Sequence, residues 1–252
     1  MNICLFSKDE IDKPLELKDP RAQHVIKILH KKEGDSFTAG IIGGASGTAV
    51  ISSIGEKLSF TFTPESEGKK LYPLVMIIGF PRPIQLKRLL RDMAGLGVSA
   101  VHLTGTELVE KSYLSSTMSS PESARQMLLD GTVQAGSTFV PEVYIHRDVR
   151  SCLEVVTAGN KNPTNANRMA LDNVNPSDSL WNYCQRKGNS FADVQNPALA
   201  AIGSERGWTD NERSIFKEYG FTLLSMGERI LRTETASTVA ASIILGAMGV
   251  LN

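Results

Sequence analysis

The sequence predicts an α/β protein with a mainly parallel sheet, preceded by a smaller β-rich domain. From residue 73 onward, short apolar runs alternate with helical patterns, which is typical of parallel strands covered by helices. Residues 1–68 instead contain short β-type runs separated by glycines, a spacing typical of a small barrel or sandwich. We therefore expect a first domain over residues 1–68 and a second over residues 73–252.

The first domain is expected to contain one helix and several short strands. The helical pattern runs from about residue 20 to residue 30, and the expected strands are 36–42, 48–54 and 58–63. Residues 63–70 are polar and charged and include proline and glycine, so they are interpreted as a linker.

The second domain is expected to alternate strands and helices. The expected strands are 74–78, 98–103, 142–145, 169–171, 198–202 and 221–224. The expected helices are 84–94, 122–135, 149–158, 177–186 and 210–219. The last of these follows Thr209-Asp-Asn-Glu212, a capping box that marks a helix start. A final helix rich in small residues, 235–251, is interpreted as buried in the core or at an interface. It is too short and too polar for a membrane span.

Composition limits the class of protein without naming it. The formal net charge is zero, so only a local basic patch would bind nucleic acid. Cys4, Cys152 and Cys184 are far apart and form no CxxC pair, which argues against a disulfide framework and against a zinc site. The first ten residues turn acidic too soon to be expected to form a signal peptide. These features favour the cytoplasm.

Two glycine-containing loops follow neighbouring apolar runs. The first is 201–208 and the second is 224–236. Loops at the ends of adjacent strands are where an α/β sheet binds a small ligand. Both loops carry a carboxylate, Glu205 and Glu234, which a phosphate cradle does not normally contain. The expected ligand is a polar cofactor without phosphates.

The residues of these loops also resemble a known family. Gly203-Ser-Glu-Arg-Gly207 and Met226-Gly-Glu-Arg-Ile-Leu-Arg-Thr-Glu-Thr-Ala236 resemble the two signature loops of the RsmE family, which are ribosomal RNA uracil N3-methyltransferases of the SPOUT superfamily. The first loop departs from the usual Gly-Pro-Glu-Gly-Gly at Ser204 and Arg206. The resemblance implies a SPOUT domain with a carboxy-terminal trefoil knot, preceded by a PUA-like β-barrel that binds RNA.

The resemblance further implies a homodimer that uses S-adenosyl-L-methionine to methylate small-subunit (16S) ribosomal RNA at N3 of a uridine. The glycines let the backbone approach such a cofactor closely. The residues assigned to cofactor binding are Leu171, Ile202, Gly203, Glu205, Gly207, Leu224, Ser225, Met226, Gly227, Ile230, Leu231, Arg232, Thr235 and Ala236.

Arg232 and Glu234 are the candidate catalytic residues. Loss of the N3 proton leaves negative charge on the uracil, and a buried cation would stabilise it. Arg232 is assigned that role, and Glu234 either orients Arg232 or lies at a helix N-terminus. The alternative is a structural ion pair between the two. No metal is expected, and His102 and His146 are interpreted as structural histidines.

Two basic stripes are candidate RNA contacts. Each also fits the solvated side of an ordinary amphipathic helix. We assign to phosphate binding the residues Arg21, His24, Lys27, His30, Lys31, Arg82, Lys87, Arg88 and Arg91. His30 stands where the family usually has arginine, and a histidine is mostly neutral at pH 7.

Three further departures keep other functions open. Gly95 replaces a family acid, and Gly95-Leu-Gly-Val-Ser-Ala100 is interpreted as a helix C-cap, not a dinucleotide motif. A family arginine is absent near Thr138. One alternative is a non-catalytic RNA-binding or ribosome-assembly factor that keeps the fold. Another is a methyltransferase for a different RNA site or atom.

Overall fold

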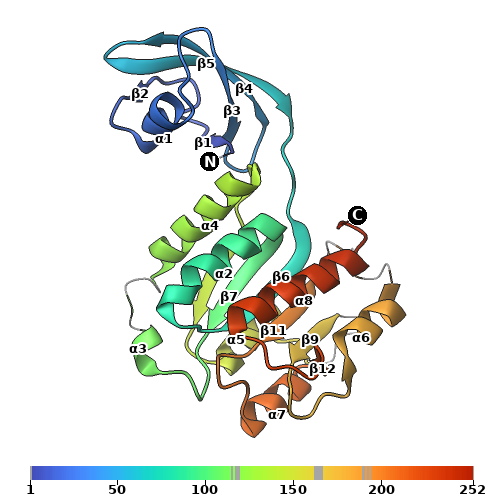
Figure 1. The fold of residues 1–252 in the computed structure, drawn as a ribbon. Helices are drawn as coiled ribbons and strands as arrows, with labels where there is room; N and C mark the ends of the chain where they lie inside the picture. Colours follow the sequence, from blue (N-terminus) through green and yellow to red (C-terminus); the bar gives the residue numbers. More distant parts are fainter. Residues whose placement is uncertain are drawn as a thin grey trace. The chain divides into compact units, whose positions relative to one another are not determined.

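The computed structural model describes residues 2–114, 116, 120–161, 167–188, 191, 193 and 195–251. The chain forms two compact units, coloured by sequence in Figure 1. Unit 1 contains Met1–Lys70 and Leu129–Val140, and unit 2 contains Leu71–Leu128 and Pro141–Asn252. Residues 129–140, which the sequence assigned to the second domain, therefore group with unit 1.

Unit 1 is built on a mixed sheet. Its elements are β1 (Cys4–Phe6), β2 (Leu15–Glu16), α1 (Pro20–Gln23), the π-helix η1 (His24–Ile28), β3 (Ser36–Ile41), β4 (Ser46–Ile54) and β5 (Lys57–Ser66). The strand order is β1-β3-β4-β5-β2. β1 pairs parallel with β3, and the other neighbours are antiparallel.

The helix expected at 20–30 begins at Pro20, where Asp19 caps it, but it changes to a π-helix at His24 and ends at Ile28. The linker predicted at 63–70 is partly wrong. β5 continues to Ser66, which pairs with Ser46, because strand pairing uses backbone groups and does not require apolar side chains.

Unit 2 contains a parallel sheet. Its strands are β6 (Tyr72–Gly79), β7 (Val98–Thr104), β8 (Glu142–His146), β9 (Arg168–Leu171), β10 (Asp178–Ser179), β11 (Ala198–Ile202) and β12 (Thr222–Ser225). The order is β10-β12-β9-β11-β6-β7-β8, and every pair of neighbours is parallel. The prediction of a mainly parallel sheet is confirmed. β10 was missed, because its two residues were assigned to the following helix.

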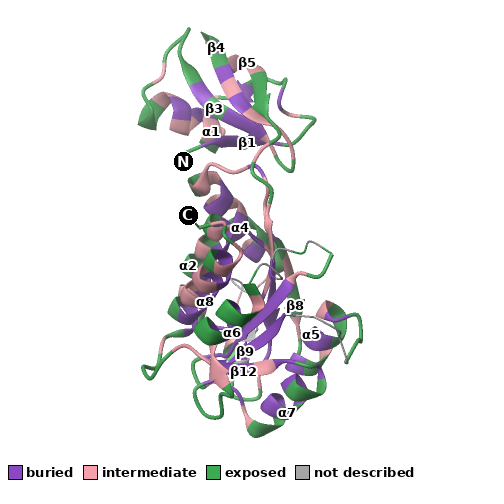
Figure 2. Cartoon of the chain, turned by 90° about the vertical axis from the view of Figure 1, so that its right-hand side faces the viewer, coloured by how far each residue is buried: buried purple, intermediate pink, exposed green. Residues whose placement is uncertain are grey.

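Helices cover both faces of this sheet. The helices in this part of the chain are α2 (Pro83–Leu96), α3 (Lys111–Leu114), α4 (Pro121–Ala135), α5 (Val149–Val156), α6 (Leu180–Lys187), α7 (Asp210–Glu218) and α8 (Thr233–Ala247). α2, α6 and α8 lie on one face, and α5 and α7 lie on the other (Figure 2). Along the chain, the division between the units falls within α4, between Leu128 and Leu129.

The caps and faces of the helices follow the sequence. α7 begins with the predicted capping box, in which Thr209 and Glu212 each bond the other's backbone N–H. α2 ends at Gly97, which has a φ of 76°, a conformation that glycine adopts without strain. α8 packs against α2 and β6. Within the described residues, no helix is both long and apolar enough to cross a membrane.

Candidate functional site

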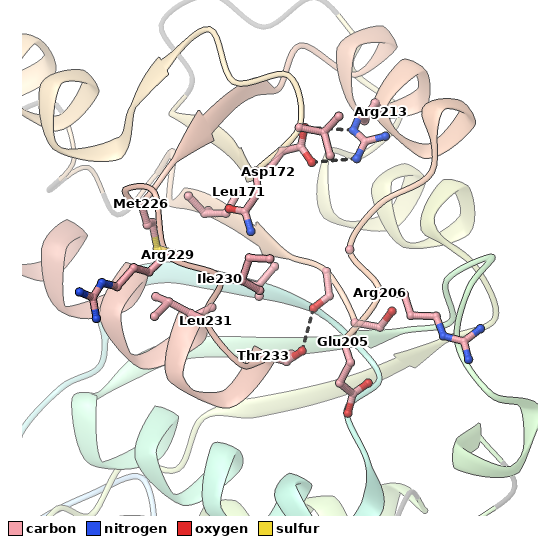
Figure 3. Close-up of a pocket in the computed structure, with 17 residues that line it drawn as sticks. Leu171, Asp172, Glu205, Arg206, Arg213, Met226, Arg229, Ile230, Leu231 and Thr233 are labelled. Carbon is pink, nitrogen blue, oxygen red and sulfur yellow. Dashed lines mark hydrogen bonds and ion pairs between the residues drawn. The ribbon is translucent and has the colours of Figure 1, made fainter.

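Three loops of unit 2 meet at one edge of the sheet. β11, β9 and β12 are parallel and adjacent, so the loops that follow them leave from the same edge. Together they enclose a cavity of about 250 Å³ (Figure 3). Its lining residues are Leu171, Asp172, Asn173, Val174, Ile202, Gly203, Ser204, Glu205, Arg206, Gly207, Arg213, Met226, Arg229, Ile230, Leu231, Thr233 and Ala236.

The loop after β11 is a tight turn that requires glycine. The Gly207 N–H donates to the Ser204 carbonyl at 2.9 Å, and Gly207 has a φ of 69°. A Cβ on Gly203 would lie 2.9 Å from the Gly207 Cα, which is closer than real Cβ contacts. The turn therefore exposes backbone groups to the cavity at a position where side chains do not fit.

Side-chain hydrogen bonds fix the three loops to one another. The Thr233 hydroxyl, at the start of α8, donates to the Gly203 carbonyl at 3.1 Å. The Trp208 indole N–H donates to the Leu171 carbonyl at 3.0 Å. The loops after β9, β11 and β12 are thus joined through residues that border the cavity or lie next to it.

The loop after β12 forms an exposed wall of the cavity. Gly227 has a φ of 102°, which most other residues adopt only with strain. The Ile230 side chain is 85% exposed although it lines the cavity. In Figure 3 the guanidinium groups of Arg206 and Arg229 extend to opposite sides, whereas Ile230 lies near the centre.

A buried ion pair that the sequence analysis missed supports the wall after β9. Asp172 directly follows β9, and Arg213 lies on α7. Arg213 Nε and Nη2 donate to the two Asp172 carboxylate oxygens, each at 3.0 Å, and both side chains are nearly buried. The Asp172 carboxylate also accepts the Asn175 N–H at 3.0 Å. The sequence signal that could have identified Asp172 is its position directly after the apolar run of β9.

Burial and hydrogen bonds act in opposite directions on the pKa of Asp172. Burial raises that pKa, whereas the Arg213 guanidinium and the loop N–H groups lower it, with a net decrease. The carboxylate is therefore ionised and satisfied. Glu205 is also partnered, since one of its oxygens accepts the Arg82 backbone N–H at 2.9 Å and lies 3.9 Å from Arg82 Nε.

Most of the predicted cofactor residues border the cavity. The lining includes Leu171, Ile202, Gly203, Glu205, Gly207, Met226, Ile230, Leu231 and Ala236. The predicted residues Leu224, Ser225, Gly227, Arg232 and Thr235 belong to the same strand, loop and helix, but they are not among the described residues that line it.

The two candidate catalytic residues differ in burial. Arg232 is exposed and is the N-cap residue of α8, so the expectation of a buried cation is wrong for the single chain. Glu234 is buried in the first turn of α8, where a carboxylate interacts favourably with the helix N-terminus. Among the residues that the structure describes, no ion pair joins Arg232 to Glu234. The catalytic role of both stays a prediction.

The predicted RNA contacts on α2 lie on its solvated side. Lys87, Arg88 and Arg91 are exposed, whereas the apolar side that includes Leu86 and Leu90 is buried. Arg88 Nε lies 3.9 Å from the Asp92 carboxylate. The amphipathic pattern is confirmed, and contact with RNA stays a prediction.

The basic stripe of unit 1 is only partly available. Lys27 and His30 are exposed. Arg21 is engaged by Asp19 at 2.8 Å and by Glu10 at 3.2 Å, and it lies over the Phe6 ring. His24 Nε2 is buried without a hydrogen-bond partner. Arg21 therefore has less free charge for phosphate than the sequence suggests.

The structure shows what surrounds two positions that depart from the RsmE pattern, Thr138 and Gly95. The Thr138 side chain is buried, and its hydroxyl donates to the Gly44 carbonyl at 2.7 Å within unit 1. Gly95 lies in α2 and is exposed, and the C-cap predicted for this segment is confirmed at Gly97. Thr138 therefore packs unit 1 at the position where an arginine was expected.

Known proteins are similar over almost the whole chain. Residues 68–245 match a family described as an RNA methyltransferase domain. The chain is 41% identical over 250 residues to the ribosomal RNA small subunit methyltransferase E of Treponema pallidum, covering 97% of this chain and 91% of that protein. It is 32% identical to the ribosomal RNA small subunit methyltransferase E 1 of Borreliella burgdorferi, covering 97% of each.

Solved structures share the fold at lower sequence identity. A ribosomal RNA small subunit methyltransferase E from Neisseria gonorrhoeae, bound to S-adenosyl methionine, superposes with a TM-score of 0.70 at 18% identity, covering 98% of this chain and 97% of that one. A putative methyltransferase from Legionella pneumophila, in complex with the same cofactor, gives 0.74 at 21% identity and 98% coverage of both chains.

Proposed function

The chain belongs to the family of S-adenosylmethionine-dependent small-subunit ribosomal RNA methyltransferases E, and on this premise we propose that it methylates a uridine at N3. The observation that carries the proposal is the cavity at the ends of β9, β11 and β12. Its two signature loops are the segments in which the sequence resembles uracil N3-methyltransferases.

The cavity suits a cofactor without phosphates. Its walls combine apolar side chains such as Leu171 and Ile202 with backbone exposed by the turn at Gly203 and Gly207. The Asp172 and Glu205 carboxylates line this cavity; they do not repel an adenosine, an ammonium or a sulfonium, whereas they oppose a phosphate. When bound, the cofactor supplies an electrophilic methyl group.

Residues of this chain position the reactants and stabilise the charge that develops during transfer. The lining holds donor and acceptor together, which accounts for much of the rate of an in-line transfer. We assign to Arg232 the stabilisation of the charge that develops on the uracil as N3 loses its proton. Because Arg232 is exposed in the single chain, the role requires that RNA or a second subunit exclude water from it.

A homodimer supplies such a cover. Ile230 and Val174 line the cavity and are largely exposed, as is Trp181 on α6. Exposed apolar groups beside a site are typical of interaction surfaces. We propose that a second copy covers them and contributes to the site.

The proposal also covers the type of domain that unit 1 forms, the knot in unit 2 and the cellular location. We assign unit 1 to a PUA-like, RNA-binding domain. We also propose that the segment between β12 and α8 forms the crossing of a trefoil knot, since α8 returns to pack on β6. The protein would act in the cytoplasm on ribosomal RNA.

Methyl transfer with purified components tests the function. The full chain is mixed with isotopically labelled S-adenosylmethionine and with small ribosomal subunits or free RNA from cells that lack the protein. We expect label at N3 of uridine in one of the two substrates. Cofactor binding without transfer to either would instead support the assembly-factor alternative, which Ser204, Arg206 and Thr138 favour.

A further inference from the structure

A cluster of two histidines and a cysteine lies in unit 2, where β7, β8 and α5 meet. His102 is on β7, His146 is the last residue of β8 and Cys152 is on α5, which covers this end of the sheet (Figure 2). One potential ligand atom from each residue lies within 4.8 Å of the others. The described lining of the cofactor cavity includes none of them.

The two imidazoles direct their nitrogens at each other. His102 Nδ1 and His146 Nε2 are 2.8 Å apart. The ring planes differ by 11° and the centroids are 5.0 Å apart, so the rings are nearly coplanar and share one proton between two nitrogens. Tyr144 stacks on His102 at 4.7 Å and fixes the orientation of that ring.

Cys152 completes the cluster as a buried, free thiol. Burial raises the pKa of this thiol. Its backbone N–H donates to the Asp148 carbonyl at 3.1 Å, in the capped first turn of α5. The helix therefore holds the sulfur close to the two rings.

We propose that His102, His146 and Cys152 bind a divalent transition metal, for which Zn²⁺ is the reference ion. Two imidazoles and one thiolate suit a borderline-soft cation, and three protein ligands leave a fourth position for water. The site is separate from the cofactor cavity and would attach α5 to β7 and β8.

Metal binding requires the side chains to move, because the two ring nitrogens now point at each other and must turn toward a common centre. Bonds of about 2.1 Å to nitrogen and 2.3 Å to sulfur place tetrahedral ligand atoms roughly 3.4 to 3.6 Å apart. The ring nitrogens, now 2.8 Å apart, must separate by about 0.6 Å, and the sulfur, now within 4.8 Å of them, must approach by up to about 1.2 Å. A second cavity, of about 510 Å³, is lined by Arg147 and Ser151, which are the chain neighbours of His146 and Cys152.

Proton balance is simple. The metal–sulfur bond replaces the S–H bond of Cys152, and this proton leaves to solvent. The proton shared by the imidazoles moves to the outer nitrogen of one ring, so both rings stay neutral. The sequence does not predict this site, because the three residues come from two strands and a helix and match no motif spacing.

Cobalt titration tests the proposal, with Co²⁺ as a spectroscopic probe for Zn²⁺. The full chain is treated with a chelator, titrated with Co²⁺ and then with Zn²⁺. We expect a thiolate-to-cobalt charge-transfer band at one ion per chain, which Zn²⁺ abolishes. The band should be lost in Cys152→Ser and retained in Cys184→Ser, a matched control because Cys184 is also a buried free thiol.

A second variant keeps the test decisive if Cys152→Ser does not fold. His146 is half-buried, and His146→Gln should weaken cobalt binding tenfold or more. Saturating Zn²⁺ should raise the Tm of the wild type by roughly 5 to 10 °C at a hundred times Kd, and should leave Cys152→Ser unchanged. Absence of stoichiometric metal binding at micromolar Co²⁺ and Zn²⁺ would overturn the site. So would equal affinity in the wild type and His146→Gln.

Discussion

Gly227 and Arg232 lie in the same loop, but Gly227 is important for its backbone conformation and Arg232 for its side chain. Gly227 has a φ of 102° and leaves open space where a Cβ would stand. Arg232 has an ordinary backbone and an exposed side chain. The first residue is therefore expected to matter for cofactor binding and the second for rate.

Replacing Gly227 by valine should weaken S-adenosylmethionine binding at least tenfold. A β-branched residue at positive φ is strained by about 1 to 3 kcal/mol, so the loop that lines the cavity must change conformation. Calorimetry measures the affinity. Gly188→Val is the matched control, because Gly188 also has a positive φ but lies outside the cavity lining. Equal affinity in both variants would show that the loop conformation is not required.

Arg232→Ala should keep near-normal cofactor affinity and reduce the single-turnover rate of methyl transfer about a hundredfold or more. The reason is that its interaction forms only as charge develops on the uracil. Lysine should restore little, because a point charge lacks the planar fork. Arg147→Ala, at another exposed arginine, is the control. An unchanged single-turnover rate would remove Arg232 from the mechanism.

At the scale of elements, the cavity depends on links between loops and helices. Arg213 on α7 connects that helix to the loop after β9 through Asp172. Thr233 on α8 connects that helix to the loop after β11. The sequence indicated the loops by their glycines, but it could not pair Asp172 with Arg213, because the two lie 41 residues apart.

Arg213→Met should destabilise unit 2 by about 3 to 5 kcal/mol, since it leaves the Asp172 carboxylate buried without its partner. Arg213→Met should also weaken cofactor affinity. The control is Arg150→Met, which breaks an exposed pair with Glu218 and should change neither stability nor cofactor affinity much.

The effect of Arg213→Met should depend on pH. Because the pKa of Asp172 is lowered in the fold, the stabilisation from its ionised carboxylate is present above about pH 4 and lost below it. Denaturant unfolding from pH 7 to pH 3 should therefore show the difference between Arg213→Met and wild type shrinking. A pH-independent difference would contradict the assignment.

The basic side of α2 predicts salt-dependent RNA binding despite the zero net charge. Neutralising Lys87, Arg88 and Arg91 together should reduce the slope of log affinity against log salt by roughly one per lost phosphate contact. Filter binding at several salt concentrations gives the slope. Neutralising Arg147 and Arg150 near α5 is the control. A slope unaltered by the α2 variant would show that this helix faces only solvent.

At the scale of the molecule, the alternation of apolar runs was enough to predict the parallel sheet and its helices. Strand order, the grouping of 129–140 with unit 1 and the His102–His146 pair were not predictable, because they depend on contacts between distant segments. Nine of the predicted cofactor residues line the cavity, since strand ends and glycines mark loops directly. Arg232 was expected to be buried, and its exposure leads to the proposal of a covering subunit.

A homodimer that covers the cavity should depend on Ile230. Ile230→Asp should shift the mass measured by light scattering from dimer toward monomer and should weaken cofactor affinity, because a charge would be buried in an apolar interface. Val155→Asp is the matched control. Val155 is also a largely exposed apolar residue, but it lies on α5, on the opposite face of the sheet from α8 (Figure 2). A dimer unaffected by Ile230→Asp would place the interface elsewhere.

The central claim is that this chain methylates N3 of a uridine in small-subunit ribosomal RNA. Mass spectrometry of nucleosides from small-subunit RNA tests it most directly, in cells with the gene, without it, and without it but expressing Arg232→Ala. We predict that 3-methyluridine is present in the first, absent in the second and not restored in the third. Equal amounts of 3-methyluridine with and without the protein would contradict the account.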